Sequence, residues 1–216
     1  MRSPTGRRRP SRCALACVCA IALARSSGTR AGDYFVNPSG TNGAFTTVQS
    51  AVDAVVGQTR TNRANIFLAP AEYVEHMTVD KPFVTFIGQG AGLEDVNISF
   101  NSTHASRGPW GAATLIGNSA TAFMARNLTF ENFAPDRNIT AALALQSNAD
   151  RAIFDNVQFL GYQDTLLVDG RARQYFRGSF ITGDADFIFG DATAVFDQCT
   201  IESTDYGRLR PPTRHE

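Results

Sequence analysis

Two carboxylates in the sequence have a type and a spacing that suit catalysis. Asp186 lies in the run ITGDADFIFG among large apolar residues, where a carboxylate is costly to keep unless it has a use. It follows Gly178 by eight residues, and Asp164 in GYQDT follows Asn156 by eight residues. Because Asn156 and Gly178 belong to similar segments, the two aspartates occupy equivalent positions of a repeat.

Equivalent positions on successive turns of a stacked-strand coil are about 4.8 Å apart. Two carboxylates that close, beside Leu166 and Phe187, cannot comfortably both be charged, so one of them is expected to hold a proton. The pair would then supply a nucleophile or base next to an acid. Gln163, just before Asp164, would add an amide donor of the kind that stabilises an oxyanion.

Aspartates also have a purely structural use, because they commonly cap turns. Asp184 is equivalent to Tyr162 one repeat earlier and so has no carboxylate partner, which favours a solvated turn residue. Capping of turns is also expected for four others: Asp150, Asp155, Asp191 and Asp197.

The repeat predicts the fold that would bring the pair together. Its three clearest copies are FDNVQF at 154–159, FRGSFI at 176–181 and FDQCTI at 196–201. The steps from Asn156 to Gly178 and then to Gln198 are 22 and 20 residues. Such a period, with strands and no intervening helices, is typical of a solenoid whose coils cover one another's apolar sides. We therefore predict an all-β chain of stacked parallel strands.

The upstream sequence fits the same class. Short apolar or alternating runs such as ANIFLAP, HMTV and FVTFIGQG are broken by Gly, Pro, Asn and Asp, as strands and turns are. One helix is expected in TTVQSAVDAVV, where five apolar residues recur at helical spacing: Val48, Ala51, Val52, Val55 and Val56.

The first residues have the form of a secretory signal peptide. The arginine-rich MRSPTGRRRPSR leads into the apolar CALACVCAIALA and an A-x-A-like exit that ends at Ala24. The apolar run is too short for a membrane anchor, which needs roughly 20 residues. We expect a signal peptide at 1–24, with cleavage as late as residue 31, and a secreted protein. The formal net charge of zero gives no field that would favour nucleic acid or membrane.

Cysteine, sequon and histidine positions add weaker expectations. Three of the four cysteines lie in the signal segment, so the mature chain would keep only Cys199 and form no intrachain disulfide. Four N-x-S/T sequons fit an exported glycoprotein: Asn97, Asn101, Asn127 and Asn138. The three histidines are scattered without ligand spacing, so no metal is expected.

The aspartate segments resemble a known family. GYQDTLLV and DFIFG, separated by RQYFRGSFITG and followed by FDQCTI, closely resemble the signature segments of the pectin methylesterases, a family of carbohydrate esterases. FTTVQSAVDAV, FLAPAEYVEHMTV, PFVTFIGQG and MARNLTFEN follow the family's order and spacing, so the resemblance covers about residues 33–207. It implies a right-handed parallel β-helix, secreted and monomeric, that acts on methyl-esterified pectin in the cell wall.

The resemblance also implies roles for individual residues. By position, the family's nucleophile falls on Asp186, its general acid and base on Asp164, and an oxyanion-stabilising glutamine on Gln163. Phe189 resembles a substrate-contacting aromatic of the cleft, with a packing role as the alternative. The implied reaction converts the methyl ester of galacturonate to a carboxylate and methanol without a cofactor.

The sequence departs from the family's pattern in three places. Ala141 stands where the family has a second glutamine, which removes one oxyanion donor, and Leu167 replaces a tyrosine. The family continues past FDQCTI to an LGRPW segment whose arginine orients the nucleophile, whereas this sequence continues to RLRPPTRHE at 208–216. We expect an incomplete β-helix domain at 33–207 that lacks the C-terminal coils, an aberrant tail at 208–216, and impaired activity.

Two other functions stay open at this point. Two carboxylates about 5 Å apart also suit a retaining glycosidase of polyuronate, although an oxyanion donor such as Gln163 favours the esterase. The missing coils favour a non-catalytic or defective β-helix that binds acidic polysaccharide.

Overall fold

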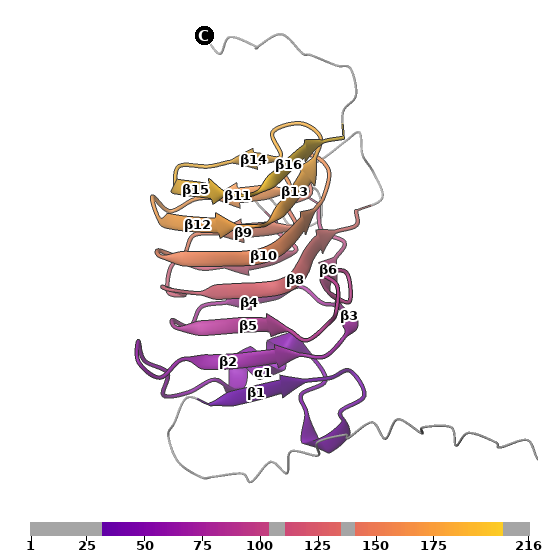
Figure 1. Cartoon of the computed structure of the whole chain (residues 1–216), viewed down its shortest axis with the longest axis vertical. Coiled ribbons are helices and arrows are strands. Elements are labelled where there is room, and N and C mark those ends of the chain that lie inside the picture. The colour runs from indigo at the N-terminus through magenta and orange to yellow at the C-terminus, as the bar shows by residue number, and fades with distance from the viewer. Residues whose placement is uncertain (1–31, 104–110, 135–140, 205–216) are drawn as a thin grey trace, which may run out of the picture.

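The structure, a computed structural model, describes residues 32–103, 111–134 and 141–204. In this part the chain winds as a stack of coils from β1 at one end to β15 and β16 at the other (Figure 1). The strands are β1 Asp33–Val36, β2 Ala64–Leu68, β3 Ala71–Val74, β4 Met77–Val79, β5 Val84–Gly88, β6 Val96–Phe100, β7 Thr114–Ile116, β8 Met124–Asn132, β9 Leu145–Ser147, β10 Ala152–Leu160, β11 Leu166–Val168, β12 Arg173–Arg177, β13 Phe180–Gly183, β14 Ile188–Phe189, β15 Thr193–Asp197 and β16 Thr200–Ser203.

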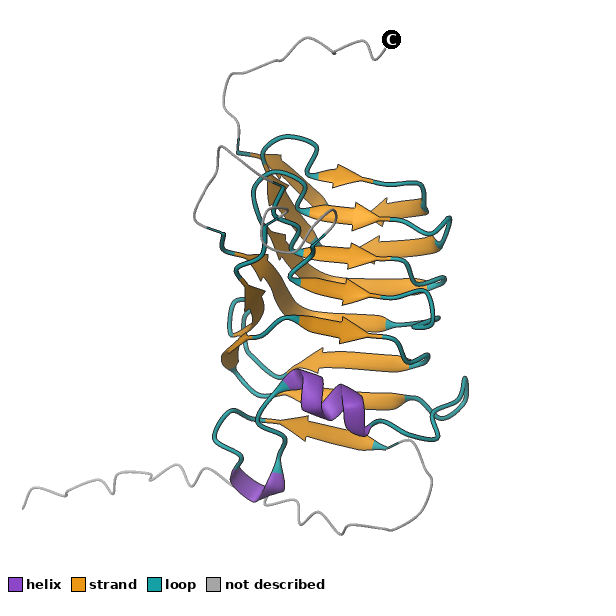
Figure 2. Ribbon diagram, turned by 180° about the vertical axis from the view of Figure 1, so that it is seen from behind, coloured by secondary structure: helices purple, strands orange, loops and turns teal. Residues whose placement is uncertain are grey.

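These strands form the walls of a parallel β-helix. One wall has the order β1-β2-β5-β8-β10-β12-β15, and the short wall has the order β4-β7-β9-β11-β14. A third wall pairs β3 with β6, β6 with β8, β10 with β13, and β13 with β16. Every ladder between the strands described is parallel. Figure 2 shows the short wall in front, with the long wall behind it. The predicted all-β class is confirmed.

The repeat found in the sequence is the coil of the structure. Phe154 pairs with Phe176, and Phe176 pairs with Phe196, which reproduces the predicted steps. The three rings stack inside the coils with centroids 4.8 Å apart at both steps. The ladder of rings therefore sets the register of the last three coils.

The corner between two walls falls at the same repeat position in each coil. Asn127, Asn156, Gly178 and Gln198 all have left-handed backbones, with φ between 54° and 57°. Asn and Gly tolerate this conformation better than other residues, and Asn156 Nδ2 donates to Asn127 Oδ1 at 3.0 Å. These corners let single strands such as β8 and β10 run through two walls.

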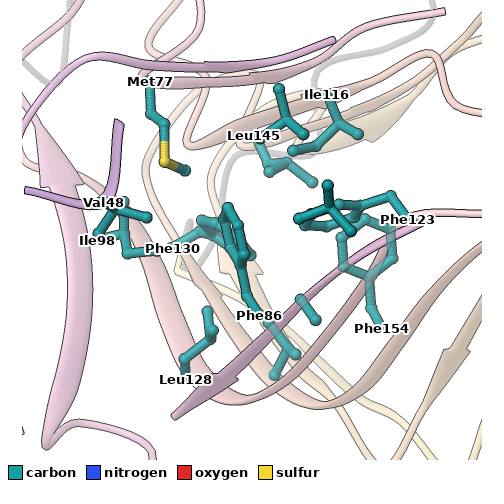
Figure 3. Close-up of a cluster of buried hydrophobic side chains, with 14 of the residues drawn as sticks. Val48, Met77, Phe86, Ile98, Ile116, Phe123, Leu128, Phe130, Leu145 and Phe154 are labelled. Carbon is teal, nitrogen blue, oxygen red and sulfur yellow. The ribbon is translucent and has the colours of Figure 1, made fainter. Parts of the chain in front are cut away.

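The interior is filled by large apolar side chains that alternate with outward residues along each strand. Phe86, Phe123, Phe130 and Phe154 are fully buried, and Figure 3 shows them pointing into the same space between the walls. Such a core is rigid, so the turns between walls are held in fixed positions.

The one α-helix of the described residues, α1 (Val48–Ala54), lies beside the first coils. Val48, Ala51 and Val52 are buried on it, and Val55 is buried just after its end. The prediction for Val56 is wrong: the helix has ended, and Val56 is 55% exposed.

The N-terminus of α1 is capped from another coil. The Glu75 carboxylate accepts hydrogen bonds from the backbone N of Val48 at 2.7 Å and of Gln49 at 2.9 Å. A carboxylate at a helix N-terminus satisfies otherwise unpaired donors and interacts favourably with the helix dipole. We expect Glu75→Ala to lower the free energy of unfolding by about 1–2 kcal/mol, measured by urea titration. Glu94→Ala, at an exposed turn, is the matched control and should change it by less than about 0.5 kcal/mol.

A buried tyrosine makes stability depend on alkaline pH. The Tyr73 hydroxyl lies within hydrogen-bond distance of the carbonyl oxygens of Ala69 at 2.8 Å and Val36 at 3.2 Å, and the residue is 3% exposed. Burial, followed by the charge of Glu75, raises the pKa of Tyr73 from 10.0 to about 12. The fold therefore favours the neutral phenol, and this stabilisation is complete below about pH 10 and is lost as pH rises through about 12.

We expect the free energy of unfolding of the wild-type chain to fall more steeply between pH 10 and 12 than that of Tyr73→Phe. The difference between the two chains should reach at most about 3 kcal/mol, which is about two pKa units. Parallel pH profiles of the two chains would assign the effect to another group.

Two of the aspartates predicted to cap turns do not do so. Asp155 lies inside β10 and Asp197 inside β15, where both form cross-coil contacts with side chains of β12. Asp150 and Asp191 do lie outside the strands, as expected. The error arose because a charged residue on the outward side of a strand resembles a turn residue in sequence.

Several predictions fall outside the described residues: the signal peptide at 1–24, the end of the domain at 205–207, the tail at 208–216 and the sequon at Asn138. In the part of the chain that the structure describes, no helix has the length and hydropathy of a membrane span.

Candidate active site

Asp164 and Asp186 lie at the same place on neighbouring coils. Asp164 is in the turn between β10 and β11, and Asp186 is in the turn between β13 and β14. The backbone N of Asp164 donates to the Ala185 carbonyl at 3.1 Å, which places Asp164 opposite Asp186 in the parallel pattern. Leu166 pairs with Ile188 just beyond the turns. The predicted equivalence of the two aspartates therefore holds in the backbone.

Both aspartates have left-handed backbones, with φ of 63° at Asp164 and 50° at Asp186. For a residue other than glycine this conformation is uncommon, although aspartate adopts it more readily than most. The same conformation recurs at the corners of the coils, as at Asn127 and Asn156, so here it shows that the two aspartates occupy equivalent turns of neighbouring coils.

Thr165 holds the two turns together. Its buried hydroxyl lies 3.0 Å from the Tyr162 carbonyl of its own turn and 3.0 Å from the Thr182 carbonyl of the next coil. A Cβ at Gly183 would overlap the Thr165 side chain and the Tyr162 carbonyl, so the close approach requires glycine there. Neither Thr165 nor Gly183 was predicted from the sequence. Their only signal was their place beside the paired aspartates.

The two aspartates differ in their access to water. Asp164 is 9% exposed, whereas Asp186 is exposed and Gln163 is half-buried. The backbone N of Asp184 donates to the Tyr162 carbonyl at 3.0 Å, which joins this turn to the preceding coil. The Asp184 carboxylate is partly exposed and accepts a hydrogen bond from the hydroxyl of Thr204 on the next coil.

Ala141 lies beside Gln163. The backbone N of Ala142 donates to the Gln163 carbonyl at 3.0 Å, which places Ala142 opposite Asp164 and Ala141 opposite Gln163. The position where a second amide donor was expected is thus one coil before the first, and a methyl group stands there. Ala141 is half-buried.

Phe189 borders the aspartates on the short wall. It pairs with Leu167 on β11, and both belong to a small apolar cluster outside the main core with Ala112, Leu143 and Ala141. Phe189 is half-buried, so it packs on this cluster and keeps part of its side chain exposed. The two roles considered for it are therefore compatible.

The arrangement has the parts required for acyl transfer. An exposed carboxylate lies one coil from a buried carboxylate, an amide side chain adjoins the buried one, and an apolar surface borders the pair. Among the described residues, no group of three or more His, Cys, Asp or Glu is placed to hold a metal ion.

Comparison with known proteins assigns the chain to a family. Residues 33–210 match the family model described as Pectinesterase. The chain belongs to the pectinesterase family. This confirms the family expected from the aspartate segments.

Curated members of the pectinesterase family show how much of the protein is matched. A pectinesterase of Ralstonia nicotianae is 37% identical over 207 residues, covering 82% of this chain and 52% of that protein. Putative pectinesterase 14 of Arabidopsis thaliana is 34% identical over 165 residues, covering 74% of this chain and 49% of that protein. The chain thus spans about half the length of these relatives.

Solved pectin methylesterases share the fold. The carrot enzyme superposes with a TM-score of 0.71 and 29% identity, over 84% of this chain and 55% of that chain. A pectin methylesterase solved in complex with a hexasaccharide superposes with a TM-score of 0.69 and 28% identity, over 78% of this chain and 54% of that chain. The roles of Asp186, Asp164, Gln163 and Phe189 stay predictions.

Proposed function

We propose that this chain carries the catalytic centre of a pectin methylesterase, which hydrolyses the methyl ester of galacturonate units in pectin to pectate and methanol. The observation that supports this most is the in-register pair of Asp164 and Asp186 beside Gln163. Membership of the pectinesterase family supports the same reaction.

In the proposed reaction an Asp186 oxygen attacks the C6 carbonyl carbon of the ester, and the carbonyl oxygen becomes an oxyanion that accepts a hydrogen bond from the Gln163 amide. Collapse of this intermediate breaks the bond to the methoxy group, and Asp164 gives its proton to the departing methanol. Asp164, now a carboxylate, removes a proton from water. The resulting hydroxide attacks the acyl group, which frees Asp186 and the galacturonate carboxylate.

The division of roles follows access to water. A polymer reaches an exposed carboxylate directly, so Asp186 suits nucleophilic attack. A carboxyl withdrawn from water suits the group that must hold a proton in the resting site, and Asp164 is the buried member. Phe189, with its exposed part next to the turn, is proposed to contact the sugar.

The chain is proposed to be a slow esterase. Loss of one oxyanion donor typically costs about 10²- to 10³-fold in rate, and Ala141 offers only a methyl group beside Gln163.

A retaining polyuronate glycosidase is the second candidate, since equivalent backbone positions on neighbouring coils are about 4.8 Å apart and such an enzyme needs two carboxylates about 5 Å apart. Incubation of the purified chain with highly methylated pectin, with methanol and reducing ends measured together, separates the reactions. We expect methanol without new reducing ends. New reducing ends would favour the glycosidase, and polymer binding with neither product would favour a non-catalytic β-helix.

We also propose that residues 33–207 form the β-helix domain of a monomeric, secreted protein of the cell wall, preceded by a signal peptide at 1–24. Expressed with its own N-terminus in a secreting host, the protein should begin after Ala24 or, at the latest, after Ala31. Secreted protein that N-terminal sequencing finds to begin at Met1 would contradict the signal peptide.

A further inference from the structure

The wall opposite the short strands carries a feature that the proposed catalysis does not use. β10, β12 and β15 lie side by side on the face turned to the viewer in Figure 1, whereas β9, β11 and β14 lie on the opposite side, in front in Figure 2. A shallow groove of about 410 Å³ runs across their outer surface. Ile153, Tyr175 and Val195 line it and pair in register across the three strands.

Alternation along β12 explains the composition of the groove. In RQYFR the residues Gln174 and Phe176 point inward and are buried, so Arg173, Tyr175 and Arg177 share the outer surface. The central tyrosine thus has an arginine on either side along its own strand.

Arginines on this face share their aspartates. Arg173 donates to Asp150 through Nε at 2.9 Å and Nη2 at 2.6 Å, and Nε of Arg151 lies 3.6 Å from the same carboxylate. On the other side of the ladder, Arg177 donates to Asp155 at 2.9 and 2.8 Å, and Arg126 lies 3.9 Å from it.

Each of these clusters therefore has two positive charges and one negative charge. The remaining carboxylate, Asp197, accepts a hydrogen bond from the Tyr175 hydroxyl at 2.6 Å. Four arginines face three aspartates across the ladder, which leaves a net positive surface. The aspartates also hold the guanidinium groups of Arg173 and Arg177 in fixed positions, which lowers the entropic cost of binding.

We propose that this groove is a second polysaccharide-binding surface, which holds a linear polyuronate away from the aspartate pair. A polyuronate repeats a sugar ring and a carboxylate along its length. The groove places Ile153, Tyr175 and Val195 on successive coils about 4.8 Å apart, and it is also lined by Arg151 and Arg173. Tyrosine offers a flat apolar surface to a sugar ring, and arginine pairs with carboxylates. The choice of demethylated pectin as the ligand rests on the proposed function.

Binding of polygalacturonate to the full chain, measured by titration calorimetry at low salt, tests the proposal. Arg151→Gln removes an arginine that is half exposed and makes only a 3.6 Å ion pair and a 3.2 Å hydrogen bond to Thr121, so we expect about threefold weaker binding. Tyr175→Ser should weaken it about fivefold, and Tyr175→Phe should restore most of the affinity.

Two controls separate this surface from other causes. Arg171→Gln makes the same charge change at an arginine outside the groove whose side chain is 91% exposed, and it should leave the affinity unchanged. Asp184→Asn removes a negative charge two residues before Asp186, at a carboxylate that the proposed catalysis does not use. It should also leave the affinity unchanged, whereas tighter binding would locate the polymer at the catalytic turn and overturn the proposal.

Three other results would contradict the proposed binding surface. They are equal affinity for polygalacturonate and fully methylated pectin, equal effects of Arg151→Gln and Arg171→Gln, and no binding at all. None of these results depends on methanol release, so failure of the esterase and failure of this surface are distinguishable.

Discussion

Replacement of Asp186 by asparagine should lower methanol release by about 10³-fold or more, because an amide is a poor nucleophile at the ester carbon. Asp164→Asn should cause a loss of similar size, since the leaving methanol would have no proton donor and water would have no base. The turn geometry is expected to survive in both variants, because asparagine tolerates the left-handed backbone found at both positions.

Asp184→Asn is the matched control for both variants. It makes the same change two residues before Asp186, on a carboxylate that accepts a hydrogen bond from Thr204. We expect most of the activity to remain. A loss at Asp184 equal to that at Asp186 would show that the proposal has chosen the wrong carboxylate of this turn. The chain covers only 52% of the Ralstonia relative. The same three variants should therefore also be made in a fusion protein in which the unmatched residues of that relative are joined to this chain.

Ala141→Gln should raise the rate of methanol release by about 10²- to 10³-fold. The backbone pairing of Ala142 with the Gln163 carbonyl places position 141 beside Gln163, one coil away. A glutamine there would add a second amide donor next to the first, where charge develops on the ester oxygen. The gain should appear in kcat, because the donor acts mainly in the transition state.

Ala142→Gln supplies the control, since it places the same side chain opposite Asp164 rather than opposite Gln163. Ala142 is buried at 1% exposure, so this variant should lower stability and give no increase in rate. An Ala141→Gln chain that folds and is no faster than wild type would contradict the assignment of position 141 to the oxyanion site.

The aspartate pair was predictable because the last coils contain nearly the same number of residues. The steps from Phe154 to Phe176 to Phe196 differ by only two residues, so equal offsets located Asp164 and Asp186 correctly. The preceding coil was harder to recognise in the sequence. Ala125 pairs with Phe154, and more residues separate these two than separate Phe154 from Phe176. Family resemblance, rather than periodicity, pointed to Ala141.

Other parts of the site could not be predicted because they depend on contacts between coils. The hydroxyl of Thr165 bridges two turns, and the sequence gives no sign that Thr182 is its second partner. The outward ion pairs are similar: Asp155 resembled a turn cap until β12 brought Arg177 alongside it. Pairing partners on separate coils are set by register, which no single segment contains.

The most direct test of the account is a double-mutant cycle on Asp164 and Asp186. The rate of methanol release from highly methylated pectin is measured for the wild type, both single variants and the double variant, including the low residual rates of the variants. Two carboxylates that act as one site give non-additive losses. We predict that Asp164→Asn combined with Asp186→Asn is no slower than the slower single variant. A combined loss equal to the product of the two single losses would contradict the account, because the aspartates would then act independently.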